Sequence, residues 1–235
     1  MIRMRVQYTK TGAVRYTSHL DTVRMFQRGF RAAGMPMIYS QGYHPHPRMS
    51  FAPPLKTGWE GLDEYVDCFL DAPVDGIADL CNPHLPEGVR ITGCRSVPLH
   101  VPKLPVSVAG ARFRLRVPLR ETDGIEPVFD GEETALLRPF EGPRSTEPEK
   151  QPAVLDLAVS RGPDAASLEY TCTMREGSYI TPERVARDVF AIPEEQGRRL
   201  RVERTKLFVK HTNHFISPLD EGTRHRARAR TAFED

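Results

Sequence analysis

A strict alternation of polar and apolar side chains runs through residues 2–8, IRMRVQY, and it constrains the fold more than any other feature. Arg3, Arg5 and Gln7 fall on one side of an extended chain, because successive side chains of a strand point to opposite faces. The alternation predicts a half-buried β-strand. A Lys-Thr-Gly turn follows it directly.

An amphipathic helix of about fifteen residues is predicted after this turn. Ser18 and Asp21 have the spacing of a helix-capping pair, and Gly34 and Pro36 end the periodic pattern. Apolar residues share one face of the helix. Three arginines recur at i, i+4 and i+7 on the opposite face: Arg24, Arg28 and Arg31.

The remainder of the first hundred residues completes a recognisable order of elements. Extended runs are predicted at 48–52, 64–70 and 88–97, and a short helix limited by Pro83 at 74–85. The resulting βαββαβ order is that of a ferredoxin-like unit. A degraded form of the same order follows, so we expect an α+β protein with tandem ferredoxin-like units, the second degenerate.

Four parts are predicted along the chain. Residues 1–97 form a ferredoxin-like N-terminal domain, and the proline-rich residues 98–110 form a linker. Residues 111–210 form the degenerate second domain, which carries an acidic insertion at 121–152. Residues 211–235 form a basic tail that we expect to be disordered, because its arginines have little apolar sequence to fold around.

Charge is segregated along the chain, although the formal net charge is only +2. Residues 1–56 hold nine Lys and Arg against one acid, residues 57–95 hold two against eight, and residues 198–230 hold ten against three. This polarity indicates a basic surface for an anionic partner such as RNA, or an acidic surface for a different partner. The alternative is that the segments neutralise one another within one fold.

Composition excludes several classes of protein. No apolar stretch approaches the ~18 residues of a membrane span, and the N-terminus lacks the apolar region of a secretory signal, so we expect a cytoplasmic protein with no membrane partner. The four cysteines have no C-x-x-C spacing. That argues against a zinc ribbon, a disulfide framework or an iron–sulfur cluster held by this chain alone. We expect no cofactor and no bound metal.

The most unusual stretch is residues 39–51, YSQGYHPHPRMSF. Its two prolines hold the chain extended, which places His44, His46 and Arg48 on one side at i, i+2 spacing. Paired imidazoles can ligate a metal, transfer a proton or bind an anion. We favour a rigid anion-binding loop, because pre-set backbone angles reduce the ordering entropy that binding costs.

A further histidine, His19, lies in the first turn of the predicted helix, where the helix dipole favours a neutral imidazole suited to a general base. His19 and His46 are therefore the catalytic candidates, and whether they share a site is left open. The candidates for anion or RNA binding are Lys10, Arg24, Arg28, Arg31, Tyr43, His44, His46 and Arg48. The structural candidates cap the helix or shape the loop: Ser18, Asp21, Gly42, Pro45 and Pro47.

Several of these motifs together resemble the radical-SAM-linked protein family, a domain of unknown function (DUF2344-like). They are K-T-G, S-H-L-D, the arginine helix, YSQGYHPHPRMSFAPPLKTG and E-Y-V-D, all within residues 1–70, with V-E-R-T-K-L near the end. Thr17 stands where the family usually has leucine or a similar residue, and His44 where it usually has asparagine. A variable position 44 weakens the two-histidine metal hypothesis and shifts weight to His19, Asp21, His46 and Arg48.

What this resemblance implies is a radical SAM protein as partner, because family members occur beside or fused to such proteins and near ribonuclease E/G. Two functions remain open. The favoured one is a non-catalytic RNA-binding or substrate-presenting accessory partner of a radical SAM enzyme acting on RNA. The alternative is a metal-independent endoribonuclease of the tandem ferredoxin-like type, with His19 as base, His46 as acid and Arg48 holding the scissile phosphate.

Overall fold

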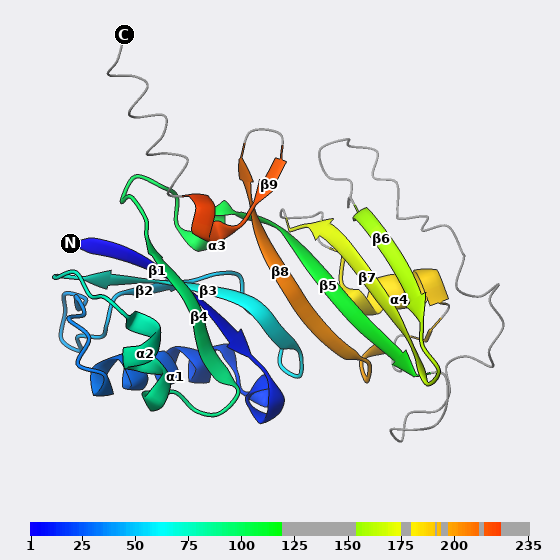
Figure 1. Ribbon diagram of the computed structural model, residues 1–235, viewed down its shortest axis with the longest axis horizontal. Helices are drawn as coiled ribbons and strands as arrows, with labels where there is room; N and C mark the ends of the chain where they lie inside the picture. Colours follow the sequence, from blue (N-terminus) through cyan, green and yellow to red (C-terminus); the bar gives the residue numbers. More distant parts are fainter. Residues whose placement is uncertain (119–153, 175–179, 191, 194–196, 212–213, 222–235) are drawn as a thin grey trace, which may run out of the picture. The chain divides into compact units, whose positions relative to one another are not determined.

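A computed structural model describes residues 1–118, 154–174, 180–190, 192–193, 197–211 and 214–221. Within them the protein is a mixed α+β fold with a nine-stranded, mostly antiparallel sheet and few helices. The chain divides into two compact units (Figure 1). Unit 1 comprises Met1–Ala109 and Lys206–Asp235, and unit 2 comprises Gly110–Thr205. The predicted acidic insertion at 121–152 lies outside the described residues, as does the tail from residue 222 onward.

Unit 1 contains the βαββαβ succession expected for the first hundred residues. β1 pairs antiparallel with both β3 and β4, and β2 pairs with β3. Short 3-10 turns at Gly12–Tyr16, Asn82–His84 and Pro218–Asp220 connect or follow these elements. The helices and strands that lie wholly within unit 1 are β1 (Ile2–Lys10), α1 (His19–Ala32), β2 (Met49–Phe51), β3 (Glu60–Leu70), α2 (Ile77–Cys81), β4 (Val89–Ser96), α3 (Leu104–Ser107) and β9 (His214–Ile216).

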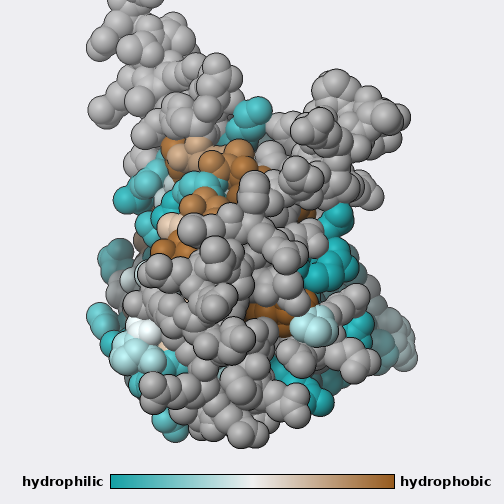
Figure 2. Space-filling view, turned by 90° about the vertical axis from the view of Figure 1, so that its right-hand side faces the viewer, coloured by the Kyte–Doolittle hydropathy of each residue, from teal (hydrophilic) through white to brown (hydrophobic). Residues whose placement is uncertain are grey.

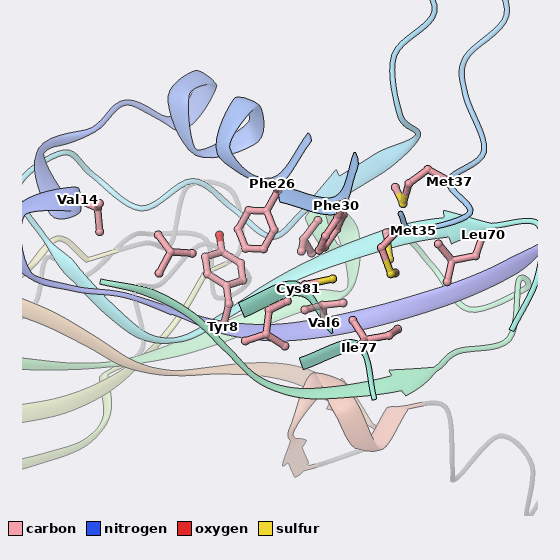
Figure 3. Close-up of a cluster of buried hydrophobic side chains, with 14 residues drawn as sticks. Val6, Tyr8, Val14, Phe26, Phe30, Met35, Met37, Leu70, Ile77 and Cys81 are labelled. Carbon is pink, nitrogen blue, oxygen red and sulfur yellow. The ribbon is translucent and has the colours of Figure 1, made fainter. Parts of the chain in front are cut away.

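One face of the unit 1 sheet is covered by α1, whose apolar side packs into the core shown in Figure 3. The Phe26 ring lies edge-on to Tyr8 of β1, with centroids 4.7 Å apart, and contacts Phe30 in the next turn. Gly29 allows the close approach of a neighbouring turn, because a Cβ there would lie 2.7 Å from the Leu85 side chain. The helical spacing of apolar residues is thus what places α1 over β1.

The other face of β1 is also buried, which corrects the expectation of a half-buried strand. Arg3 and Arg5 are 2% and 0% exposed. Segments remote in sequence cover them. Arg3 donates to the carbonyl oxygen of Val101 at 2.5 Å, and Arg5 donates to that of Pro218 at 3.0 Å.

The segment predicted as a linker, residues 98–110, therefore contributes to the interior of unit 1. Val101, Leu104 and Val108 are buried in it, and it contains α3. Proline has no backbone N–H but keeps its carbonyl oxygen, which still needs a hydrogen-bond donor when it is buried. Here the Arg3 guanidinium donates to the carbonyl oxygens of Val101 and Pro102. Part of the predicted tail is structured as well, since residues 214–221 include β9 and a 3-10 turn.

Unit 2 is built around strands β5 (Val108–Pro118), β6 (Val154–Arg161) and β7 (Ala165–Thr173), with helix α4 (Pro182–Phe190). β7 pairs antiparallel with β5 and with β6. The first half of β8 (Arg201–His211), up to Thr205, belongs to unit 2 and lies beside β5, and its second half belongs to unit 1. Figure 2 shows that both hydrophobic and hydrophilic residues reach the surface on its coloured parts.

Alternation along β5 separates an apolar face from a charged face. Phe113 stacks on Tyr170 at 5.4 Å, and the Tyr170 hydroxyl donates to the carbonyl of Ile180 just before α4. Phe113 and Leu115 are therefore core residues, and Arg112, Arg114 and Arg116 point to the other face. Among the described residues, no helix is long and apolar enough to cross a bilayer.

Candidate functional site

The outward face of α1 carries the three predicted arginines. Arg24, Arg28 and Arg31 are all exposed, whereas Thr22, Phe26, Gly29 and Phe30 on the other side of the helix are buried. Arg24 lies 3.6 Å from the Asp21 carboxylate, and both side chains are about half exposed. No described carboxylate lies within ion-pair distance of Arg28 or Arg31. We call these three residues the α1 arginine row.

The unusual stretch forms a hairpin, residues 37–48. Tyr39 forms a β-bridge with Pro47, and the amide of Arg48 donates to the carbonyl of Ile38 at 2.8 Å. Gly42 has φ of +135°, a backbone conformation that side-chain-bearing residues rarely adopt, so glycine is required at this turn. Tyr43 beside it is 96% exposed. The hairpin thus presents an aromatic ring at its tip.

The hairpin histidine that the sequence favoured is held by its neighbours. The His46 amide donates to the Ser40 hydroxyl at 3.1 Å, and the Ser40 hydroxyl lies 3.0 Å from Nδ1 of the His46 ring. Nδ1 also lies 3.4 Å from the carbonyl of His44. Pro47 is buried, whereas His44, Pro45 and His46 are exposed. The ring orientation of His46 is therefore set by contacts within the hairpin.

His19 occupies a different place, a small hollow at the start of α1. The hollow has a volume of about 10 Å³, and its lining includes Tyr8, Lys10, His19, Thr22, Phe51 and Glu64. The exposed His19 ring lies edge-on to Phe51, with centroids 5.4 Å apart. Partial burial, together with the positive charge of Lys10, lowers the pKa of His19. His19 is accordingly a neutral proton acceptor near pH 7.

Lys10, one of the residues predicted to bind an anion or RNA, is buried. It is 3% exposed, and its Nζ donates to the carbonyl of Thr17 at 2.8 Å. Lys10 is still beside His19, so the structure brings these two predicted residues together. The N-cap of α1 is Ser18, whose hydroxyl accepts from the Asp21 amide at 3.1 Å and donates to the Asp21 carboxylate at 2.7 Å. That is the contact that their spacing predicts.

His19 and Arg48 lie on opposite faces of the unit 1 sheet. The Arg48 guanidinium lies over the Phe69 ring, 5.0 Å from its centroid. Phe69 alternates along β3 with Cys68 and Leu70, which belong to the core under α1, so Phe69 points away from α1. His19 is on the α1 side, against Phe51. A single site that uses both His19 and Arg48 is not present in this arrangement.

The comparisons with known proteins identify the family. A bacterial family described as "Uncharacterized protein conserved in bacteria (DUF2344)" matches residues 3–175. The chain belongs to this family. No curated protein matches it. A crystal structure described as that of an unknown protein from Galdieria sulphuraria is 13% identical, with 88% of this chain and 96% of that chain covered and a TM-score of 0.26.

The DUF2344 region of the chain includes the α1 arginine row, the hairpin and the hollow. A buried charge network that sequence reasoning missed joins this region to Glu221, which lies beyond it. Asp67 accepts from Arg3 at 2.8 Å and from Arg5 at 2.7 Å, and Arg5 donates to Glu221 at 2.6 Å. Burial opposes the charge of Arg5, but its bonds to Asp67 and Glu221 raise its pKa.

The basic N-terminal segment of this DUF2344 protein is therefore partly neutralised inside the fold. Arg3 and Arg5 pair with Asp67, and Arg15 lies 3.0 Å from Glu60. The E-Y-V-D motif could have indicated these pairs in the sequence, because an acid within an apolar strand needs a buried partner.

Within the described residues no three His, Cys, Asp or Glu side chains gather as metal ligands would. Burial raises the pKa of the Cys68 and Cys172 thiols to about 12.

Proposed function

We propose that this protein is a non-catalytic RNA-binding protein that presents RNA to a partner enzyme. The observation that carries the proposal is the α1 arginine row, three exposed cations on one helix face with one half-exposed carboxylate, Asp21, beside them. A row of exposed arginines can neutralise several phosphates of an RNA chain, and each neutralised phosphate releases counterions. An exposed aromatic ring at the hairpin tip, Tyr43, supplies a surface on which a base can stack.

We propose in addition that both units are ferredoxin-like. The support is a shared strand order. In unit 1 β1 lies between β4 and β3, with β2 on the far side of β3, and in unit 2 β5 lies between β8 and β7, with β6 on the far side of β7. An early duplication of one βαββαβ unit accounts for this order and for the repeated arginine and apolar alternation of β1 and β5.

The partner that we propose is a radical SAM enzyme, on the basis of the family motifs described above. The hairpin is the segment of the chain in which these motifs are densest, and its backbone is held by two prolines and the Ser40–His46 contacts. A rigid, exposed hairpin loses little conformational entropy on binding. It therefore suits either the RNA or the enzyme that receives it.

The endoribonuclease alternative retains one favourable observation, the neutral His19 beside buried Lys10. A general base needs a pKa near or below the working pH, which His19 has. Incubation of the protein with labelled RNA in EDTA discriminates the two functions. Cleavage that leaves 2′,3′-cyclic phosphate ends and is lost in His19→Ala, with RNA binding retained, would contradict the non-catalytic proposal.

Replacement of the α1 arginine row tests the proposal directly. Arg24→Ser, Arg28→Ser and Arg31→Ser together should weaken binding to structured RNA and flatten the log–log salt dependence by roughly 2–3, since each neutralised phosphate contributes about 0.7–0.9. Fluorescence anisotropy across a salt series measures both quantities.

A matched control removes the same charge from exposed positions elsewhere. It combines Arg90→Ser, Lys103→Ser and Lys206→Ser, all of which lie away from α1. The control should retain most of the affinity. Equal losses in the two triple variants would show that net charge, rather than the α1 arginine row, determines binding.

A further inference from the structure

Unit 2 contains a pocket that is independent of the α1 arginine row. Its volume is about 390 Å³, within the usual range for small-molecule sites. Arg114 and Arg116 of β5 form one side, and Arg201 and Glu203 of β8 form another. The turn between β6 and β7, residues 162–165, closes one end together with the start of β7. All of these residues lie in the same compact unit.

The strand register determines which of these arginines has an acidic partner. Arg112 lies opposite Thr171 of β7, which is itself opposite Asp156 of β6, and Arg112 pairs with Asp156 at 3.1 Å. Arg114 lies opposite Glu169 and pairs with it at 2.6 Å. Arg112 and Arg114 therefore each meet a carboxylate from a neighbouring strand.

Arg114 is held more firmly than the others. Its second bond, at 3.2 Å, goes to Glu203 of β8, so it is fixed between two strands. The hydrogen bond that Arg114 donates to Glu169, with the charges of both acids, raises the pKa of Arg114. Arg114 thus serves as a rigid, charge-compensated wall of the pocket.

Arg116 breaks this pattern. Its partner position on β7 is Ser167, which faces Ser160 of β6. A serine therefore stands opposite Arg116, whereas Glu169 stands opposite Arg114. No described carboxylate lies within ion-pair distance of the exposed Arg116 side chain. Arg201 carries a further guanidinium into the pocket lining, with its Nε 3.9 Å from Glu203. Positive charge is therefore least compensated at the Arg116 end.

We infer that this pocket binds the phosphate group of a nucleotide, with Arg116 as its main anchor. A guanidinium offers two parallel donors to a phosphate, and serine hydroxyls complete such a site. The carboxylates of Asp164 and Glu203 also line the pocket, and they can accept hydrogen bonds from the hydroxyl or amino groups of a nucleoside. Their negative charge disfavours a polyphosphate, so the fitting ligand is a nucleoside monophosphate or the 5′-phosphorylated end of an RNA.

Calorimetric titration of the full chain tests the inference with adenosine monophosphate, adenosine and inorganic phosphate as probes. The monophosphate should bind, and adenosine should bind at least about tenfold more weakly, because it lacks the charge-assisted bonds to Arg116. Arg116→Ser should reduce monophosphate affinity by about tenfold or more, and Arg116→Lys by less, since lysine keeps the charge but loses the two-pronged geometry.

Arg199→Ser is the matched control, because Arg199 is exposed in the same unit and does not line the pocket. It should leave the affinity unchanged. The inference is overturned if the monophosphate does not bind, or if Arg116→Ser and Arg199→Ser bind it equally. Comparison of 5′-phosphorylated and 5′-hydroxyl RNA then separates the two sources of the phosphate: a preference lost in Arg116→Ser assigns the pocket to RNA ends, and no preference assigns it to free nucleotides.

This result is separable from the proposed RNA-binding function. The triple replacement of the α1 arginine row should leave monophosphate binding intact, because those residues lie in unit 1. Monophosphate binding without any affinity for RNA would support the pocket and contradict the proposed function. RNA binding without monophosphate binding would support the proposed function and contradict the inference about the pocket.

Discussion

At the scale of single residues, the structure places two predicted functional residues, His19 and Lys10, in the lining of one hollow. A helix start and a strand end bring them into one hollow, although nine positions separate them in the sequence. Partial burial lowers the pKa of His19, and the positive charge of Lys10 lowers it further, so both favour the neutral imidazole. The sequence could predict a neutral His19 from the helix dipole. It could not predict Lys10 as a neighbour, because alternation along β1 does not say what covers each face.

The titration of His19 should therefore have a midpoint below the ordinary histidine value of about 6.5. Lys10→Met should raise that midpoint, because it removes the positive charge beside His19. Because the unfolded chain binds a proton at a higher pH than folded His19 does, stability should fall as pH drops below about 6.5, and His19→Gln should lessen this fall. Histidine-resolved NMR titration and urea unfolding at several pH values measure these effects. A midpoint unmoved by Lys10→Met would contradict the assignment.

At the scale of elements, α1 is the part of the fold that the sequence predicts most completely. Its cap, its buried Phe26 and Phe30 and its exposed arginines all follow from local spacing, and the structure shows each of them, whereas Leu20 at the start of the apolar face is exposed. The hairpin is predicted less well. Two prolines indicate extended chain on one side of Gly42, but the partner strand, residues 37–40, contains no pattern that announces it. Long-range pairing decides such a segment, and local propensity does not.

Removal of the α1 cap should destabilise unit 1 without altering its charged surface. Ser18→Ala should lower the free energy of unfolding by about 1 kcal/mol, because the Asp21 amide loses its acceptor. Ser18→Asn, which keeps a capping side chain, should stay close to the wild type. Urea denaturation provides the comparison, and a Ser18→Ala variant as stable as Ser18→Asn would show that the cap is dispensable.

At the scale of the whole molecule, folding pairs some of the basic residues of one segment with acidic residues of another. Arg3 and Arg5 of the basic segment meet Asp67 of the acidic segment, so the alternative of internal neutralisation is correct for these residues. The α1 arginine row is not neutralised in this way. Counting charges along the chain could not separate the two groups. The difference depends on a face of β1 that is covered by residues about a hundred and about two hundred positions away.

Asp67 pairs with both buried arginines, and its replacement should strongly lower the free energy of unfolding. Asp67→Asn should cost about 3–5 kcal/mol of unfolding free energy, because two buried arginines would lose their shared counter-charge. Asp71→Asn, at an exposed position just beyond β3, is the control and should cost little. Chemical denaturation followed by far-UV circular dichroism measures both. A cost below about 1 kcal/mol for Asp67→Asn, the scale of a surface pair, would show that the network is not a main source of stability.

The bond between Arg5 and Glu221 also sets an order of events during synthesis. β1 is translated before unit 2, yet one of its buried guanidiniums acquires its second partner only after more than two hundred further residues have been made. The whole of unit 2 is translated in that interval. A contiguous unit of this kind can fold as it emerges, whereas a unit closed by a distant segment must wait. Translation of unit 1 therefore starts before that of unit 2 and is completed after it.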